Sequence, residues 1–411
     1  MYAILEAEPG LFYILSSWQS NAFGPSILSI TSAGALQTMH SFPPYTRMTT
    51  LVQSANGMLY APAQLNPSGA HVYYSIAPSG KDLHEIPLPG AWASALKTIA
   101  APPGQVYDIV GRYRDNATTN AFARVDENGG FTILHQFSTS EGFPVGGANL
   151  AYGADGNIYG IATQLEQGVS PGFIFRLTPG GVYSHLVAFP EFPRAATAFP
   201  LIAASDGNLY GTFGKGGKNG TGAIYRVTLT GQLQTLADFP AKGLREPWTL
   251  MQAADGNLYG TTNFNQIFSY NTATNQLAMV YQMDPHGSQG KCGCILTEGM
   301  DGKLYGLAPY GGRYPGIGTV FSVDIGLPMP KPIVTGAYLA SAPASRKAVL
   351  WGNYLLGVTS VTVHGIRATE FASTSVHSVR IRVPAGANAG PVSVTTANGT
   401  FSSTTLNFAM Q

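Results

Sequence analysis

Residues Asp206-Gly207-Asn208-Leu209-Tyr210-Gly211 form the stretch of sequence that decides the fold. Near-identical hexapeptides recur at residues 155–160, 255–260 and 301–306, and degenerate copies precede them. The glycine of this stretch marks seven positions, separated by 46 to 52 residues: Gly10, Gly57, Gly104, Gly156, Gly207, Gly256 and Gly302. A period of this length identifies a repeat protein, in which each unit is one supersecondary structure.

Each unit alternates apolar and polar residues with a period of two, which indicates short β-strands. In unit five, Gly207 supplies the positive φ of a hairpin between the first two strands, and a second turn at Thr230-Gly231 joins strands three and four. Four antiparallel strands repeated seven times predict a seven-bladed β-propeller over residues 1–326. The seventh unit runs into three prolines between residues 326 and 332, so its blade is expected to lack a conventional fourth strand.

The composition changes at about residue 332, where the hairpin motif disappears. Residues 349–352, 358–363, 379–384 and 392–396 alternate strictly, and glycine turns lie between them. Short alternating strands over residues 332–411 predict a small immunoglobulin-like β-sandwich. The expected fold class is therefore all-β, with two domains.

The overall composition supports a packed β protein and argues against two classes of partner. The 411 residues include 50 glycines and 28 prolines, 45% are hydrophobic and 10% are charged, which describes a chain that can bury a core. The formal charge of +1 is far from the large positive charge expected of a protein that binds nucleic acid or an anionic membrane. No apolar run approaches the roughly 20 residues of a spanning helix, and the first residues lack the basic region of a signal peptide.

Units four to seven and the tail carry motifs found in known families. The Asp-Gly-Asn-Leu-Tyr-Gly-Thr and Gly-x-Ile-Tyr-Arg-Val-Thr stretches of unit five, followed by Leu-x-Thr-Leu-x-x-Phe, resemble the tandem GloVer repeats of bacterial, notably acidobacterial, proteins. The tail, with Gly352-Asn-Tyr-Leu and residues 361–365 and 383–394, is similar to IPT/TIG domains. The resemblances imply a propeller followed by an immunoglobulin-like domain, secreted or at the cell surface of a bacterium, with a cytoplasmic location left open. They imply no reaction, because the shared residues are turn glycines, hairpin aspartates and core aromatics.

The two ends of the predicted ring differ in regularity. Both kinds of short turn emerge at one end, the hairpin face, which is expected to be inert. The loops between strands two and three and the crossings between units gather at the other end, the loop-rich face, where a rigid scaffold usually carries binding residues. Residues that do not recur are the candidates for ligand binding there, and aromatic rings among them suit a sugar: Trp18, Trp92, Tyr113, Arg114, Arg245, Glu246, Trp248 and Tyr314.

A catalytic set can also be assembled at the loop-rich face. His286 or Tyr310 would act as a general base, and Arg47 or Arg313 as a neutralising cation. Arg47, Glu246 and Cys292 each lie ten residues before the glycine of their unit, near the expected channel mouth. The alternative interpretation is a structural Arg and Glu with a core thiol.

No cofactor and no metal are predicted. Cys292 and Cys294 are either buried thiols or a redox or metal pair completed by other blades. The aspartate of each hairpin stands alone, with too few oxygen neighbours for calcium, and is predicted to cap its turn.

Three functions are consistent with these patterns. The favoured one is an extracellular or cell-envelope recognition protein that binds a glycan or a partner protein on the loop-rich face. The first alternative is a lyase or hydrolase acting on a polysaccharide or glycoconjugate, and the second is a structural surface-assembly protein. Converging charges with shifted pKa values would indicate an enzyme, exposed aromatics a binder, and large apolar patches an assembly protein.

Overall fold

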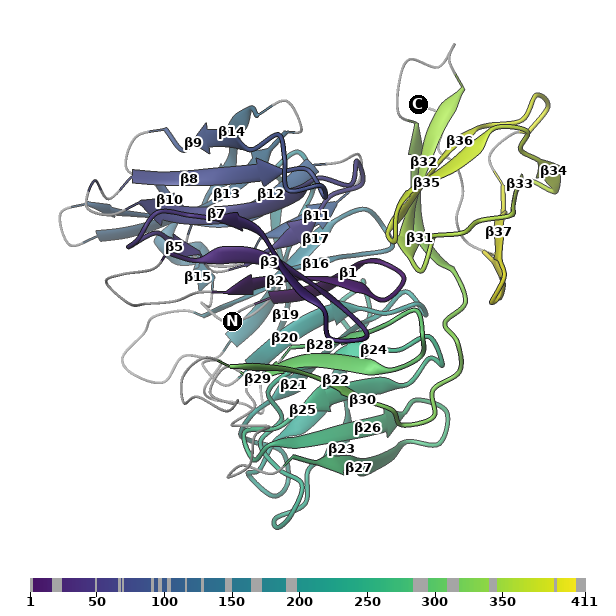
Figure 1. Ribbon diagram of the computed structural model, residues 1–411. Coiled ribbons are helices and arrows are strands. Elements are labelled where there is room, and N and C mark those ends of the chain that lie inside the picture. The colour runs from purple at the N-terminus through teal and green to yellow at the C-terminus, as the bar shows by residue number, and fades with distance from the viewer. Residues whose placement is uncertain are drawn as a thin grey trace.

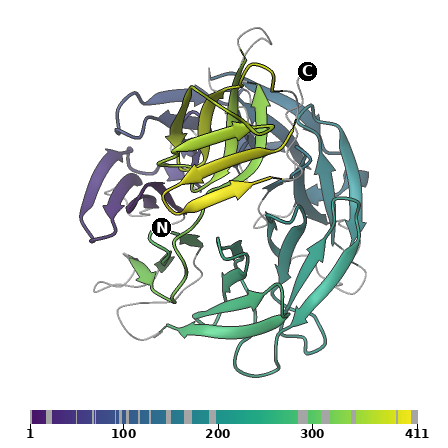
Figure 2. The ribbon, with the colours of Figure 1, turned by 90° about the vertical axis from the view of Figure 1, so that its right-hand side faces the viewer.

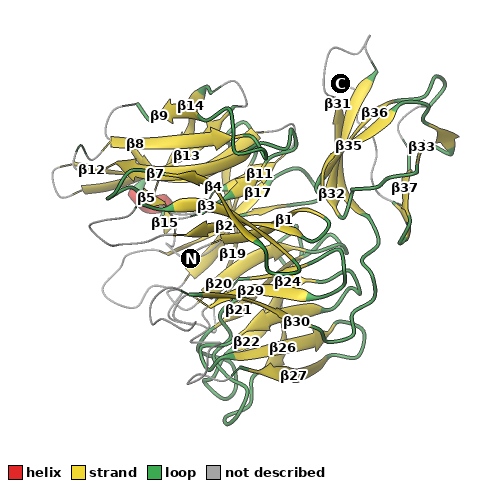
Figure 3. Ribbon diagram, in the orientation of Figure 1, coloured by secondary structure: helices red, strands yellow, loops and turns green. Residues whose placement is uncertain are grey.

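The computed structural model describes residues 3–16, 24–48, 50–65, 68, 70–89, 92–94, 98–101, 105–114, 117–126, 129–144, 150–163, 172–189, 198–283, 295–308, 318–339, 346–387 and 390–403. These residues form an all-β protein, in which one 3-10 turn, η1 (Thr139–Glu141), is the single helical element (Figure 3). Within the same residues, no helix has the length and apolar character needed to cross a membrane.

Seven antiparallel sheets follow one another along residues 3–323, one for each sequence unit. Sheet 1 contains β1 (Ala3–Glu8), β2 (Leu11–Ser16), β3 (Ser26–Thr31) and β4 (Leu36–Ser41). Sheet 2 contains β5 (Arg47–Met48), β6 (Val52–Gln53), β7 (Leu59–Leu65), β8 (Ala70–Ile76) and β9 (His84–Pro87). Sheet 3 contains β10 (Trp92–Ser94), β11 (Ile99–Ala101), β12 (Gln105–Arg114), β13 (Ala117–Val125) and β14 (Phe131–Gln136).

The remaining four sheets of this series repeat the pattern. Sheet 4 contains β15 (Phe143–Pro144), β16 (Ala151–Tyr152), β17 (Ile158–Thr163), β18 (Gly172–Leu177) and β19 (Tyr183–Ala188). Sheet 5 contains β20 (Ala198–Ala203), β21 (Leu209–Phe213), β22 (Ala223–Val227) and β23 (Leu233–Asp238). Sheet 6 contains β24 (Met251–Gln252), β25 (Leu258–Thr261), β26 (Gln266–Asn271) and β27 (Gln276–Gln282). Sheet 7 contains β28 (Leu296–Glu298), β29 (Leu304–Ala308) and β30 (Thr319–Val323), so in the described chain it lacks a fourth strand, as the prolines indicated.

The hairpin between the first two strands is built by the recurring stretch. In sheet 5, Asp206 Oδ1 accepts a hydrogen bond from Asn208 N (3.0 Å), and Asp206 Oδ2 accepts one from the Tyr210 hydroxyl (2.8 Å). Gly207 has a φ of +82°, in the left-handed region that favours glycine. The same two bonds are made by three other hairpin aspartates: Asp155, Asp255 and Asp301. These aspartates therefore cap their turns, as predicted.

Neighbouring sheets pack face to face around the ring that Figure 2 shows end-on. The cluster between sheets 4 and 5 is centred on Tyr159 and Tyr225, both fully buried. Phe12 and Ile14 of sheet 1 pack with Tyr305 of sheet 7, and the ring centroids of Phe12 and Tyr305 are 4.0 Å apart. This contact between the first and last sheets closes the ring. The most exposed strands are the fourth ones, such as β4 and β27, so they form the outer edge and the first strands face the centre.

The C-terminal residues form two more antiparallel sheets that enclose their own core. Sheet 8 has the order β31 (Ile333–Leu339), β32 (Lys347–Asn353), β36 (Ser378–Arg382), β35 (Phe371–Ser375). Sheet 9 has the order β34 (Ile366–Arg367), β33 (Ser360–Val363), β37 (Val392–Thr396), β38 (Gly399–Ser402). Leu350 and Val379 of sheet 8 and Val361 and Val394 of sheet 9 are fully buried between them. The result is a small sandwich with a core independent of the ring.

The sandwich lies against the hairpin face of the ring, as Figure 1 shows. Ser378 Oγ and Thr374 Oγ1 donate to the carbonyl oxygen of Ala55, in the hairpin of sheet 2, at 2.7 and 3.2 Å. The buried Tyr354 hydroxyl donates to the carboxylate of Glu298, which precedes the hairpin of sheet 7. The expectation that the hairpin face is inert is therefore wrong, because it carries the contact between the domains.

Candidate functional site

The structure describes part of the set that the sequence nominates for the loop-rich face. Seven residues that the sequence singles out as candidates lie outside the described ranges: Trp18, His286, Cys292, Cys294, Tyr310, Arg313 and Tyr314. Tyr113 and Arg114 end β12. Arg47 is exposed on β5, opposite Gln64 of β7. Trp92 of β10 is half-buried and packs on the apolar cluster between sheets 2 and 3, so part of its surface serves the core.

Arg245, Glu246 and Trp248 come together on the crossing from sheet 5 to sheet 6. Trp248 N donates to the carbonyl oxygen of Thr261 (2.7 Å), at the end of β25. Glu246 N donates to the carbonyl oxygen of Thr221 (2.7 Å), in the loop before β22. The crossing is therefore bonded to the loop before β22 in sheet 5 and to the end of β25 in sheet 6, which fixes its position.

The backbone of Glu246 is held in a conformation that few residues adopt. Its φ is +53°, which is uncommon for a residue with a side chain. The Thr221 bond holds one side of the residue, and the Glu246 carbonyl oxygen accepts a hydrogen bond from Asn263 N (3.0 Å) on the other. The Asn263 side chain also donates to Glu246 Oε2 (3.3 Å). Residues in such strained positions concentrate at binding and catalytic sites.

Phe264 completes this group, and the sequence reasoning missed it. Arg245 lies over its ring, with the guanidinium carbon 4.0 Å from the ring centroid, which is a cation–π contact. Gln282 Nε2 donates to the carbonyl oxygens of Phe264 (3.2 Å) and Asn265 (3.3 Å), which anchors the loop. Phe264 and Trp248 are each 37% exposed. The sequence signal was an aromatic residue in a loop between strands two and three.

We call Arg245, Glu246, Trp248, Asn263 and Phe264 the Arg245 platform. It offers two exposed aromatic rings, a guanidinium, an amide and a carboxylate on backbone that is bonded from both sides. The neighbouring loops and strand end of sheet 5 add three exposed lysines and one carboxylate, Lys215, Lys218, Lys242 and Asp238. Among the described residues of these elements, cations therefore outnumber carboxylates.

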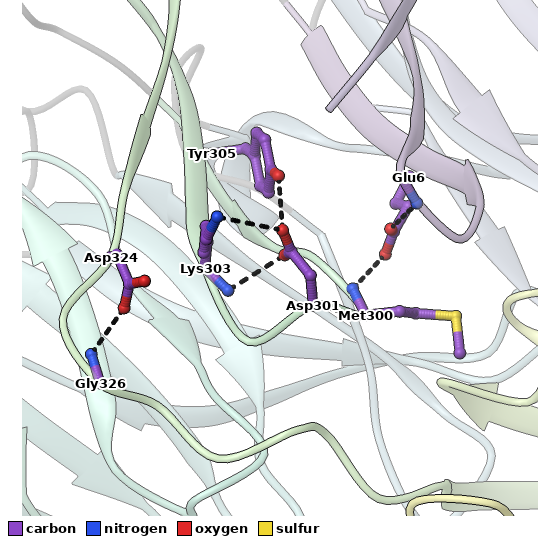
Figure 4. A network of polar contacts seen from close by, with 8 residues as sticks. Glu6, Met300, Asp301, Lys303, Tyr305, Asp324 and Gly326 are labelled. Atoms are coloured by element: carbon purple, nitrogen blue, oxygen red, sulfur yellow. Dashed lines mark hydrogen bonds and ion pairs between the residues drawn. The ribbon is translucent and has the colours of Figure 1, made fainter. Parts of the chain in front are cut away.

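The carboxyl groups whose pKa is raised by burial lie elsewhere, at the hairpin face, and Figure 4 shows one of them, Glu6. Glu6 Oε1 accepts a hydrogen bond from Gly10 N and Glu6 Oε2 accepts one from Met300 N, both at 2.8 Å, so Glu6 links the hairpins of sheets 1 and 7. Burial raises the pKa of Glu6 to about 7 against the opposing effect of these bonds. Glu298 accepts from Ala254 N (2.8 Å) of sheet 6, and burial raises its pKa as well.

A glutamine at the same repeat position shows what these carboxyl groups do. Gln252 also lies four residues before its hairpin glycine, and its Oε1 accepts a hydrogen bond from Ser205 N (2.8 Å) of the preceding sheet. An amide cannot titrate, yet it makes the same link between neighbouring hairpins. We therefore interpret Glu6 and Glu298 as structural bridges between sheets and not as an acid–base pair. The sequence signal was present, as Glu or Gln recurs four residues before four of the glycines.

A sequence comparison identifies the repeats of the second half of the ring. The profile of the Gloeobacter/Verrucomicrobia repeat matches residues 196–329, which hold sheets 5 to 7. A search of curated proteins gives no significant match.

Solved structures resemble the chain at low sequence identity. Virginiamycin B lyase from Staphylococcus aureus superposes with a TM-score of 0.53 at 17% identity, covering 74% of this chain and 90% of the lyase chain. Oligogalacturonate lyase from Vibrio parahaemolyticus gives 0.54 at 10% identity, covering 77% and 86%. The extracellular domain of a hybrid two-component system from B. thetaiotaomicron gives 0.52 at 14% identity; it covers 99% of this chain, which spans only 55% of that one. At these identities the likeness concerns the fold alone, and the chain has a β-propeller fold that contains Gloeobacter/Verrucomicrobia-type repeats.

Proposed function

We propose that this protein recognises a glycan through the Arg245 platform, outside the cell or at the cell envelope of a bacterium. The proposed scaffold is a seven-bladed β-propeller, one blade for each of sheets 1 to 7, followed by an immunoglobulin-like domain of the IPT/TIG type made of sheets 8 and 9. The observation that carries the proposal is the pair of exposed rings on the hydrogen-bonded crossing and its neighbouring loop, Trp248 and Phe264, together with the Arg245 guanidinium that lies over the Phe264 ring.

The chemistry of the platform suits a sugar ring. Exposed aromatic faces pack against the apolar face of a pyranose, and polar groups beside them bond its hydroxyls. Asn263 and Glu246 supply such groups next to Trp248 and Phe264, and their mutual hydrogen bond orients them before a ligand arrives. A site whose groups are already ordered loses less entropy on binding.

The charge around the platform favours an acidic glycan. Lys218 Nζ lies 3.9 Å from Asp238 and is partly neutralised, whereas Lys215 and Lys242 extend from exposed loop positions. The Arg245 guanidinium rests on an aromatic ring, and a planar guanidinium can bind a carboxylate with two parallel hydrogen bonds. Uronic acids are therefore the expected sugars.

A panel of neutral and uronic-acid oligosaccharides, screened against the full chain and followed by calorimetry, tests the proposal. Trp248→Ala and Phe264→Ala are each expected to weaken binding of the best ligand at least tenfold, which corresponds to about 1.4 kcal/mol. Tyr45→Ala, which removes an aromatic residue that is 52% exposed on another crossing, is the matched control and should leave binding unchanged. Binding that is indifferent to both platform variants, or no binding across the panel, rejects the proposal.

The lyase or hydrolase alternative stays a prediction and is tested on the same panel. Its nominated general bases, His286 and Tyr310, lie outside the described residues. Turnover of any oligosaccharide that is lost in His286→Ala would favour the enzyme, whereas unchanged substrate after prolonged incubation favours recognition.

A further inference from the structure

Sheet 7 has a free outer edge in the described chain, whereas the other six sheets of the ring end in a fourth strand. Among the described strands, β30 pairs with β29 alone. Its register is the one that β22 has with β21: Val323 lies opposite Leu304, as Val227 lies opposite Leu209. Val320 and Phe321 are half-buried, although the equivalent Ile224 and Tyr225 of sheet 5 are fully buried. The seventh sheet therefore keeps the geometry of the others without the strand that covers it.

The completed sheets show what a fourth strand does. Its first apolar residue packs on the preceding sheet, beside the tyrosine that follows the hairpin and two residues of that sheet's own fourth strand. In sheet 5 this residue is Leu233, which belongs to the same apolar cluster as Tyr159, Leu186 and Val187 of sheet 4. Three other sheets repeat the arrangement with Phe131, Tyr183 and Leu277.

The corresponding place on sheet 6 is a cavity of about 500 Å³. It is lined by Tyr259, Val280 and Tyr281, which occupy the same repeat positions as the three sheet 4 residues of the Leu233 cluster. The other wall is the end of β30 and the residues after it, from Ser322 to Ile325. The cavity thus lies where four other sheets receive the first apolar residue of a fourth strand.

A second observation lies on the opposite side of the same edge. Leu36, the first residue of β4, is 60% exposed, although the equivalent Leu233 and Leu277 are half-buried. Sheet 1 follows sheet 7 around the ring, so Leu36 lacks the fourth strand on which it would pack. It lies opposite Ile30, which belongs to the apolar cluster that also contains Val320 of β30.

The backbone of β30 is oriented to pair with an added strand. In sheet 5, the carbonyl oxygen of Gly222 accepts from Phe239 N (2.9 Å) and Thr228 N donates to the carbonyl oxygen of Gln232 (3.0 Å), so alternate residues of that strand bond outwards. The equivalent residues of sheet 7 are Gly318 and Asp324, and no described strand lies beside them. An exposed edge of this kind is a template for β-augmentation.

We propose that the β30 edge binds an extended segment of a partner protein as the fourth strand of sheet 7. The segment is expected to carry large apolar residues at positions i, i+3 and i+6, the last one preferably Phe. This spacing is present in five fourth strands of this protein, for example Leu233, Leu236 and Phe239. The first side chain enters the cavity beside Tyr259, and the second covers Leu36.

A synthetic peptide with the sequence of residues 231–239, Gly-Gln-Leu-Gln-Thr-Leu-Ala-Asp-Phe, is the probe. Fluorescence anisotropy with the full chain is expected to show saturable one-to-one binding, and hydrogen exchange is expected to slow at residues 318–324. A peptide with its two Leu and its Phe replaced by Ser should not bind. Equal binding of the two peptides, or no binding of the first, overturns the proposal.

Variants of the protein locate the site without depending on one substitution. Val280→Lys places a charge in the cavity, and Leu36→Ser removes apolar surface that is already exposed. Each variant should therefore weaken binding of the peptide at least tenfold. Met279→Lys is the matched control, because this residue is 51% exposed and neighbours Val280 on β27. Peptide binding that survives both test variants overturns the proposal. The proposal is also overturned if light scattering shows that the protein is a dimer and that both variants are monomers, because the edge would then pair with a second copy.

Discussion

Replacing the buried Glu6 by glutamine is expected to stabilise the protein at alkaline pH, although Glu6 accepts two backbone hydrogen bonds. The reason is that burial raises the pKa of Glu6 from 4.5 to about 7. Gln252 shows that an amide fits the same repeat position, where it accepts from Ser205 N and donates to the carbonyl oxygen of Gly256 (3.0 Å). Glu6→Gln therefore keeps the link to Met300 N while it removes the charge.

The sign follows from the direction of the shift. Because the folded-state pKa of Glu6 is raised, the folded state holds a proton in a pH range in which the unfolded state has released it. The stabilisation from this proton is fully present below pH 4.5 and is lost as the pH rises through about 7. A shift of this size corresponds to roughly 3 kcal/mol, and losing the bond from Gly10 N costs about 1 kcal/mol. Glu6→Gln should therefore be less stable than the natural protein at low pH and about 2 kcal/mol more stable at high pH.

Thermal unfolding of the full chain at about pH 4.5 and about pH 8.5 measures the effect, which amounts to a few degrees in Tm. Glu8→Gln is the matched control, since Glu8 is an exposed carboxylate of the same strand and should leave the pH dependence as it is. A Glu6→Gln protein whose Tm follows the same pH profile as the natural protein would refute the reasoning. An equal loss of stability at both pH values would show that the two backbone bonds outweigh the buried charge.

Three further substitutions test other contacts. Tyr354→Phe removes the hydroxyl that donates to Glu298, and this should weaken the docking of the C-terminal sandwich by about 1–3 kcal/mol, seen as faster limited proteolysis between the domains. Asp206→Ala should cost about 1.5–3 kcal/mol of stability in denaturant unfolding, and the pKa of Tyr210, which burial and then Asp206 raise to about 12, should fall in ultraviolet titration. Gly260→Ala forces a Cβ into a backbone carbonyl oxygen and an aromatic ring of sheet 6, which should cost about 1–3 kcal/mol in thermal unfolding.

The repeated part of the fold could be predicted from the sequence because the conformation of each turn depends on residues within the turn itself. A glycine at positive φ and an aspartate that caps the hairpin act within six residues, so Asp206-Gly207 is readable without knowledge of the rest of the chain. The short seventh sheet could be predicted for the same reason, from local prolines. The docking of the sandwich could not be predicted from the sequence. Ser378 and Thr374 carry no local signal of a contact, and their role depends on the hydrogen bonds to Ala55, which is more than 300 residues away in the chain.

The candidate site was partly predictable. Arg245, Glu246 and Trp248 are close in sequence and do not recur, and the structure places them on one crossing. Phe264 was missed because its contact with Arg245 depends on how the loop of sheet 6 folds back over the crossing, and sequence spacing does not reveal this. The carboxyl group of Glu6 was missed for a related reason, since its pKa is set by burial between two sheets that are almost 300 residues apart in the chain.

The position of the sandwich determines which surfaces remain for ligands. Its contacts with Ala55 and Glu298 place it over the hairpin face, so the loop-rich face at the other end of the ring stays available. The β30 edge belongs to the circumference of the ring and to neither end. A glycan on the Arg245 platform and a peptide strand on sheet 7 would therefore contact different sheets and need not compete. If both proposals hold, the peptide should bind with the same Kd in the presence of saturating glycan, and a protein of this design would connect a sugar-bearing surface to a protein partner.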